Sequence, residues 1–96
     1  MVAMATLTDA EITTGLATLP GWAREGDEIV KTFDCGTFPA AIAFVVRIGF
    51  FAERADHHPD LEVRWKRVRV ALTTHDAGGL TAKDLDLARE IEGVGA

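Results

Sequence analysis

The stretch "LEVRWKRVRVALTTH", residues 61–75, limits the possible folds most strongly, because its apolar alternation changes parity partway along. The apolar residues fall on odd numbers first and on even numbers afterwards: Leu61, Val63 and Trp65, then Val68, Val70 and Leu72. Successive side chains of a strand point to opposite faces, so strict alternation cannot change parity without a turn or a bulge. We therefore expect two antiparallel strands, joined by a turn near Lys66 and Arg67.

Basic residues fall outside this apolar pattern, at Arg64, Lys66, Arg67 and Arg69. A solvated strand face is the simpler interpretation of this cluster, and recognition of an anion or a partner is the alternative. The cluster does not make the chain basic, since its formal net charge is −5. That charge argues against general nucleic-acid binding, which needs a broad basic surface.

A second hairpin is predicted in "WAREGDEIVKTFD", residues 22–34. Gly26 and Asp27 suit a two-residue turn, and apolar residues alternate with polar ones after it. The alternation is imperfect, so it does not fix which face of the hairpin is buried.

Three further segments carry the start signals of helices. Thr8 is followed by Glu11 three residues later, as a capping box requires, and Thr37 precedes Pro39, which a first helical turn tolerates. Thr81 can cap the last helix. The resulting order, α-β-β-α-β-β-α, predicts an α+β fold in which a four-stranded antiparallel sheet carries three helices on one face. With 96 residues, we expect a single domain spanning residues 1–96.

The helix expected after Thr37 is the most apolar part of the chain. Its apolar residues form two neighbouring stripes: Phe38, Ile42, Val45, Gly49 and Ala52, and beside them Phe44, Ile48 and Phe51. This arc is wider than one sheet face needs, so the helix is either fully buried or meets another copy of itself. In so short a chain we favour a homo-oligomer, a dimer or a tetramer. Arg47 interrupts the apolar run, so no membrane span is expected.

The chain has one cysteine, Cys35, and therefore no intrachain disulfide. This fits a reducing compartment, and we expect the protein to be cytoplasmic. A small packing role for Cys35 is favoured over a catalytic one.

The three histidines all fall where predicted elements end. His57 and His58 directly precede Pro59, which disfavours helical geometry at the residue before it, and His75 follows the last predicted strand. Loop positions of this kind commonly carry functional residues. Three roles stay open on this reasoning: acid–base chemistry near neutral pH, zinc binding with a water as fourth ligand, and plain exposed polar residues or caps. No HExxH or CxxC spacing supports the zinc interpretation.

The segments "AERADHHPDL" and "VRVALTTHDAGGLT", followed by Asp84, resemble the pterin-4a-carbinolamine dehydratase family. The resemblance covers about residues 7–94 and is most specific from residue 53 to residue 84. It implies a four-stranded antiparallel sheet with packed helices, and oligomers that pair sheets or central helices. It also implies the removal of water from a 4a-hydroxytetrahydropterin, which recycles the cofactor of aromatic amino-acid hydroxylases. No metal and no organic cofactor is expected.

The same resemblance implies the catalytic residues His57, His58, His75 and Asp84. His57 and His75 are expected to transfer the protons, while His58 binds and orients the pterin. Asp84 has an alternative role, because it lies three residues after Thr81 and could close a capping box; one residue could serve both roles.

Five further positions are expected to contact the substrate: Glu53, Asp60, Leu61, Trp65 and Thr74. Glu53 lies one helical turn before His57, so a hydrogen bond between them is feasible, although an exposed carboxylate is an equal alternative. Leu61 and Trp65 depart from residues often found in the family, which would alter how a pterin stacks.

A competing hypothesis is a non-catalytic protein-binding module on the same fold, acting as a transcriptional coactivator or an assembly factor. The wide apolar arc of the central helix would permit such a role. The sequence identifies no particular protein partner.

Overall fold

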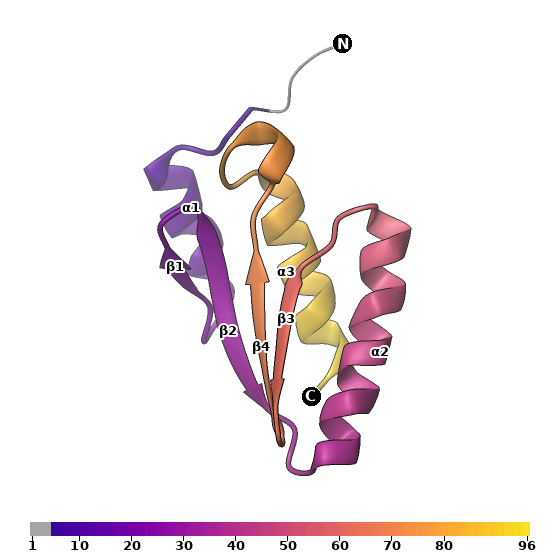
Figure 1. Ribbon diagram of the computed structural model, residues 1–96. Coiled ribbons are helices and arrows are strands. Elements are labelled where there is room, and N and C mark those ends of the chain that lie inside the picture. The colour runs from indigo at the N-terminus through magenta and orange to yellow at the C-terminus, as the bar shows by residue number, and fades with distance from the viewer. Residues whose placement is uncertain (1–4) are drawn as a thin grey trace.

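The computed structural model describes residues 5–96 and confirms the predicted order of elements. The elements are α1 (Asp9–Leu16), β1 (Ala23–Glu25), β2 (Glu28–Asp34), α2 (Phe38–Ala55), β3 (Asp60–Arg64), β4 (Arg67–Leu72), a short 3₁₀ turn η1 (His75–Ala77) and α3 (Ala82–Val94). The four strands form one antiparallel sheet in the order β1-β2-β4-β3. The three helices lie on one side of this sheet (Figure 1). The predicted α+β architecture is therefore correct.

The helix starts follow the local signals in the sequence. Thr8 and Glu11 form a capping box at α1, and the Thr37 side chain accepts a hydrogen bond from the backbone N–H of Ala40 at the start of α2. Capping of this kind satisfies backbone N–H groups that have no partner within the helix. The pKa of Glu11 is lowered, chiefly because its carboxylate accepts a hydrogen bond from the backbone N–H of Thr8.

The core lies between the helices and the covered face of the sheet. Its fully buried members come from α2, β2, β4 and α3, and the largest are Phe44, Ile29, Ile48, Leu72, Leu87, Ile91, Val68 and Val70. The even-numbered residues of β4 face this core, as the parity of the sequence predicted. The α2 and α3 helices pack against each other on the covered side of the sheet (Figure 1).

The β3–β4 turn lies one residue earlier than predicted. Arg64 pairs with Arg67 across the ladder, so the two turn residues are Trp65 and Lys66. Trp65 adopts a left-handed backbone with φ 55°, a conformation that favours glycine. The expectation failed because neither turn residue is of a type that marks turns in a sequence.

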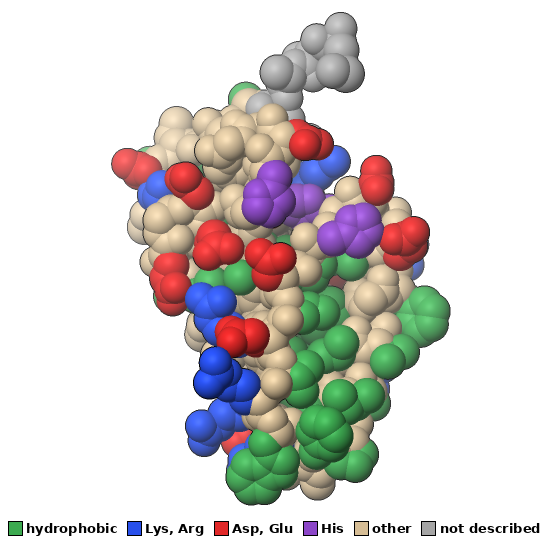
Figure 2. Space-filling view, in the orientation of Figure 1, with side chains coloured by type: hydrophobic (Ala, Val, Ile, Leu, Met, Phe, Trp, Pro, Cys, Tyr) green, Lys and Arg blue, Asp and Glu red, His purple; other side chains and the backbone are tan. Residues whose placement is uncertain are grey.

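One side of α2 stays exposed in the single chain. The buried positions are Ala41, Phe44, Ile48 and Ala52, whereas Phe38, Ile42, Val46 and Phe50 are exposed. Figure 2 shows apolar side chains gathered over this side of the molecule, next to β3. We call Phe38, Ile42, Val46 and Phe50 the α2 apolar face. No helix among residues 5–96 combines the length and apolar character needed to cross a bilayer.

Candidate active site

The two adjacent histidines are separated by the way α2 ends. Asp56, the residue after the helix, has a left-handed backbone with φ 51°, and the backbone N–H of His57 reaches back to the carbonyl of Ala52 at 3.1 Å. This tight exit turns His57 inward, where it is 9% exposed, and leaves His58 at the surface. Pro59 then starts the extended path into β3, so two consecutive imidazoles point in different directions.

His57 contacts a fully buried carboxylate. Its Nε2 lies 2.6 Å from Oδ1 of Asp84, whose exposed fraction is 0%. Asp84 is the third residue of α3 and completes a capping box there, because its Oδ2 accepts from the backbone N–H of Thr81 at 2.9 Å. Both roles considered for Asp84, the helix cap and the partner of a histidine, are present at once.

The donors around Asp84 indicate which nitrogen of His57 carries a proton. The Thr74 hydroxyl donates to Oδ2 at 2.8 Å, and the Thr81 hydroxyl lies 2.8 Å from the Thr74 hydroxyl. When the Asp84 carboxylate is ionised it only accepts hydrogen bonds, and His57 then donates to Oδ1 from a protonated Nε2. Within residues 5–96 no buried side-chain nitrogen or oxygen lacks a partner. The arrangement leaves Nδ1 of His57 as the nitrogen available to a substrate.

All three histidines line one hollow of about 190 Å³. Its wall consists of residues from the end of α2, the end of β4, η1 and the start of α3: Asp56, His57, His58, Thr73, Thr74, His75, Asp76 and Lys83. Figure 2 shows the histidine side chains gathered at this end of the molecule. His75 is exposed at the start of η1, so its ring is accessible from the solvent. The hollow thus holds two accessible imidazoles and one that is anchored to a buried acid.

Glu53 binds a different histidine from the one predicted. Its Oε1 lies 2.9 Å from Nε2 of His58, and both side chains are largely exposed. The reason is the left-handed residue Asp56, which rotates His57 away from the helix surface that Glu53 occupies. Glu53 can therefore orient His58, but it does not contact His57.

The remaining residues predicted to contact the substrate lie at different distances from the hollow. Thr74 is buried in the wall of the hollow, and Asp60 begins β3 directly after Pro59. Leu61 is half-buried against the core. Trp65 follows the end of β3 that is remote from the histidines. The five residues of β3 separate it from Pro59, a distance of roughly 16 Å along the strand. Within a single chain the histidine hollow does not include Trp65.

Four residues of the hollow had no functional expectation attached to them: Asp56, Thr73, Asp76 and Lys83. Lys83 places a cation at the rim, beside the anchored His57. Asp56 could have been found only from its position between a helix and an X-Pro segment, where a left-handed residue commonly ends a helix. Thr73 and Asp76 are sequence neighbours of Thr74 and His75, and that adjacency alone did not indicate a functional role.

Metal binding was the other role considered for the histidines. Residues 5–96 contain no group of three or more His, Cys, Asp or Glu side chains arranged to hold a metal ion. The contacts that do form, between His57 and Asp84 and between His58 and Glu53, are the pairings of histidines with orienting carboxylates.

Known proteins resemble this chain over nearly its whole length. Residues 5–94 match the family model described as pterin 4 alpha carbinolamine dehydratase. A relative from Roseiflexus sp. (strain RS-1), named provisionally as a pterin-4-alpha-carbinolamine dehydratase, is 59% identical over 86 residues, which is 90% of this chain and 92% of the relative. A similarly named relative from Nocardia farcinica is 55% identical over 90% of each chain.

Two solved structures extend the comparison. The fold matches the crystal structure of a transcriptional coactivator/pterin dehydratase from Brucella melitensis with a TM-score of 0.90 and 31% identity, over 95% of this chain and 99% of that one. A pterin dehydratase-like RuBisCO assembly factor of the alpha-carboxysome shares the fold, with a TM-score of 0.66 and 18% identity over 77% of this chain and 88% of that one. Its level of identity supports the fold alone. The chain, matched over nearly its whole length by the family model and by relatives above 50% identity, belongs to the pterin-4-alpha-carbinolamine dehydratase family.

Proposed function

We propose that the protein dehydrates a 4a-hydroxytetrahydropterin to a quinonoid dihydropterin by histidine acid–base catalysis. The observation that carries this proposal is the convergence of His57, His58 and His75 on one hollow, with His57 held by the buried Asp84. The names of the relatives support the same substrate class.

The reaction requires one acid and one base. The C4a–O bond breaks after the hydroxyl oxygen receives a proton, so that water leaves instead of hydroxide. The lone pair on N5 forms the new C4a=N5 double bond, and the N5 proton passes to the base. Positioned imidazoles perform such transfers and contribute typically about 10²–10⁴-fold each.

The geometry favours His57 as the base. Because Nε2 donates to Asp84, a neutral His57 offers the Nδ1 lone pair to the N5 proton of the substrate. The imidazolium that forms stays in contact with the carboxylate of Asp84, which is held in turn by Thr74 and Thr81. His75, which is exposed and lines the same hollow, then supplies the proton to the leaving hydroxyl.

A proton-transfer role is less well supported for His58 than for His57 and His75. Its side chain is largely exposed and pairs with Glu53, so we assign it to binding and orienting the pterin. Thr74 lines the hollow and Asp60 follows His58 by two residues, so we assign both to the same binding surface. Direct contact of Leu61 or Trp65 with a pterin would require a neighbouring subunit to bring them near.

We further propose that the protein works as a homo-oligomer in the cytoplasm. The α2 apolar face leaves Phe50 73% exposed and Val46 53% exposed, and Val63 of the edge strand β3 is 37% exposed. Contiguous apolar surface of this kind favours self-association. In the cell the reaction would return the hydroxylated pterin of an aromatic amino-acid hydroxylase to its recycling route.

The second candidate is a protein-binding module without catalysis. The same α2 apolar face favours it, and the Brucella melitensis structure is named as a transcriptional coactivator/pterin dehydratase. The presence of His57, His58, His75 and Asp84 in one place favours the enzyme, since a scaffold has no need of an anchored imidazole.

A turnover assay separates the two candidates. The purified protein should accelerate formation of quinonoid dihydropterin from a chemically prepared 4a-hydroxytetrahydropterin, followed by absorbance, with and without exhaustive chelation. We expect His57→Ala and His75→Ala to lose at least about tenfold in rate, and Arg89→Ala on the exposed side of α3 to retain it. A wild-type protein without activity would reject the enzyme. Loss of activity on chelation, restored by zinc, would reject the metal-free mechanism.

A further inference from the structure

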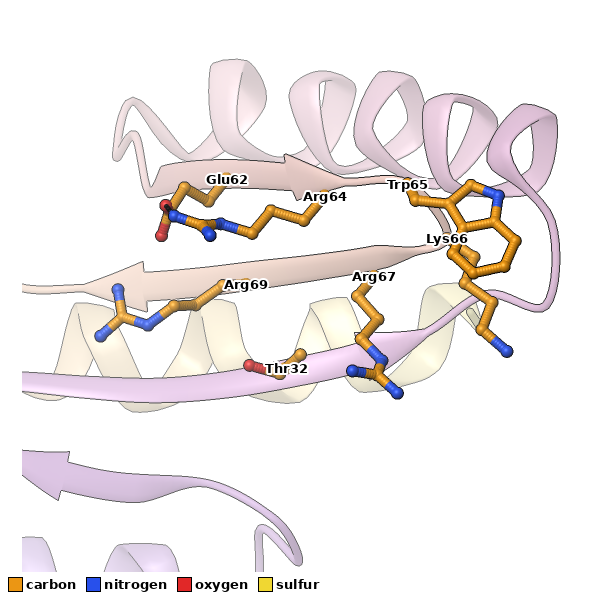
Figure 3. A pocket seen from close by; sticks show the side chains of 7 residues that line it. All are labelled: Thr32, Glu62, Arg64, Trp65, Lys66, Arg67 and Arg69. Carbon is orange, nitrogen blue, oxygen red and sulfur yellow. Dashed lines mark hydrogen bonds and ion pairs between the residues drawn. The ribbon is translucent and has the colours of Figure 1, made fainter.

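A second hollow, of about 280 Å³, lies on the face of the sheet that the helices leave uncovered. Its wall consists of Thr32 from β2 and a run of residues from the β3–β4 hairpin: Glu62, Arg64, Trp65, Lys66, Arg67 and Arg69. Figure 3 shows the arginine side chains lying over this open face, with Trp65 at the hairpin end. It contains the basic cluster singled out in the sequence, and the proposed dehydration uses none of these cations.

The strand register places the basic residues at neighbouring positions of the hairpin, while their side chains run in different directions (Figure 3). Arg64 and Arg67 are direct cross-strand partners, and Arg69 lies two residues further along β4 on the same face. Like charges directly opposite each other destabilise a sheet. Four cations and one carboxylate line the hollow in a chain whose formal net charge is −5, so this is a local reversal of the overall charge.

The acids nearby do not neutralise the cluster completely. Arg64 pairs with Glu62 at 3.2 Å, Arg69 with Glu25 at 3.0 Å and Lys66 with Asp34 at 3.5 Å. Exposed pairs of this kind are weak and exchange readily. Within residues 5–96, Arg67 has no ion pair and no side-chain hydrogen bond in the structure. Asp34 is the cross-strand partner of Arg67 on β2, so the Arg67 guanidinium lies near a carboxylate without forming a direct ion pair, and two neighbouring guanidiniums are held loosely.

Trp65 adds an aromatic surface to this anion-attracting face. The indole is 73% exposed, and it is carried by a residue with φ 55°, where glycine would be less strained. Backbone strain that persists at an exposed position points to a use for the side chain. Lys66 Nζ lies 5.4 Å from the centre of the indole ring, so cationic and aromatic groups adjoin at the mouth of the hollow.

We propose that this hollow binds a small phosphate monoester carried on a planar aromatic ring, the ring stacking on Trp65 and the phosphate binding Arg67 and Arg64. A phosphate monoester has three terminal oxygens and can bind two guanidiniums at once, whereas a carboxylate has two oxygens. The limited volume of the hollow and the net charge of −5 favour a small ligand over a polyanion. The site lies at the opposite end of β3 from the histidines and is independent of the proposed dehydration.

The test uses the full chain labelled with ¹⁵N and adenosine 5′-monophosphate as the probe. Trp65 and Trp22 give two indole N–H signals, and Trp22 serves as an internal reference because its indole donates to Glu92 away from the hollow. We expect saturable shifts of the Trp65 indole and of the Arg67 amide. Adenosine and inorganic phosphate, each carrying half of the recognition chemistry, should bind at least about tenfold more weakly.

Matched variants complete the test. Arg67→Gln should weaken the nucleotide about tenfold or more, the loss expected for one charge-assisted pair, whereas Arg89→Gln on α3 should leave the affinity unchanged. The amide spectrum of each variant reports whether it is folded. The proposal is overturned by any of four results: no shift at Trp65, equal binding of adenosine, equal effects of the two variants, or shifts confined to the His75 region. Tighter binding of a single-stranded oligonucleotide than of the nucleotide would assign the face to nucleic acid instead.

Discussion

Replacing Asp84 with asparagine should reverse the proton arrangement of His57 with little change in shape. In the wild-type protein Asp84 accepts from three donors: Nε2 of His57 at 2.6 Å, the Thr74 hydroxyl at 2.8 Å and the backbone N–H of Thr81 at 2.9 Å. In Asp84→Asn the amide oxygen can keep the two donors at the Oδ2 position. The NH₂ group then faces His57, so Nε2 must become the acceptor and the ring proton must move to Nδ1.

This arrangement allows the loss of stability and the loss of catalytic rate in Asp84→Asn to be estimated. Hydrogen bonds to a charged group contribute about 1.5–3 kcal/mol each and neutral ones about 0.5–1.5, so each of the three bonds should weaken by about 1–1.5 kcal/mol and the free energy of unfolding should fall by about 3–4.5 kcal/mol. For a domain of this size, each kcal/mol lowers Tm by about 4–8 °C. The rate should fall by about 10²–10⁴, the usual contribution of a general base, because a protonated Nδ1 cannot accept the N5 proton. In serine proteases, an Asp→Asn change beside the catalytic histidine likewise keeps the geometry but imposes the wrong tautomer, and the rate falls by about 10⁴.

Three measurements check this prediction together. Thermal unfolding gives the stability loss, the turnover assay at a temperature where the variant is folded gives the rate, and ¹⁵N shifts of the His57 ring give the tautomer. Thr74→Val is the matched control, since it removes one donor to Asp84 but leaves the contact with His57 in place. A folded Asp84→Asn protein with the wild-type rate would refute the assignment of His57 as base, whatever its tautomer.

Three further outcomes are expected. Ile48→Ala, at a position with 0% exposure, should lower the free energy of unfolding by about 2–5 kcal/mol in urea titrations, and a loss below about 1 kcal/mol would contradict its place in the core. Phe50→Glu on the α2 apolar face should reduce the mass measured by light scattering to that of a monomer, while Thr14→Glu on the exposed side of α1 should not; equal masses for all three proteins would argue against this interface. Burial raises the pKa of the Cys35 thiol, so less thiolate is present in the folded state and alkylation by iodoacetamide at pH 8 should be slower than in the urea-unfolded chain. An equal alkylation rate in both states would show that the thiol is not desolvated.

Much of the fold was predictable because its signals are local. The Thr8–Glu11 and Thr81–Asp84 pairs are each three residues apart, and the backbone and side-chain bonds that they make lie within one helical turn. The parity change between Val63 and Val68 required a break in the strand whatever the rest of the chain did. The break was predicted one residue too late, since Trp65 occupies the left-handed turn site against its backbone preference.

The sequence named the histidines and Asp84 that the structure brings together, but it did not predict the contacts between them. The histidines and Asp84 were identified by resemblance, and the capping role of Asp84 followed from spacing alone. The contact between His57 and Asp84 joins residues 27 positions apart, and it depends on how α2 ends and how α3 packs. The pairing of Glu53 was assigned to the wrong histidine for the same reason, because helical spacing does not extend past the left-handed residue Asp56.

The carboxylate of Asp84 is shared by three segments that leave the ribosome at different times: the exit of α2, the end of β4 and the start of α3. A growing chain that has been synthesised only as far as Leu80 already contains every imidazole, yet nothing holds His57 in its tautomer. The same residue also starts α3, so docking of this last helix and orientation of the His57 ring are a single folding event. A nascent or C-terminally clipped chain should therefore be inert toward a pterin even when its sheet has formed.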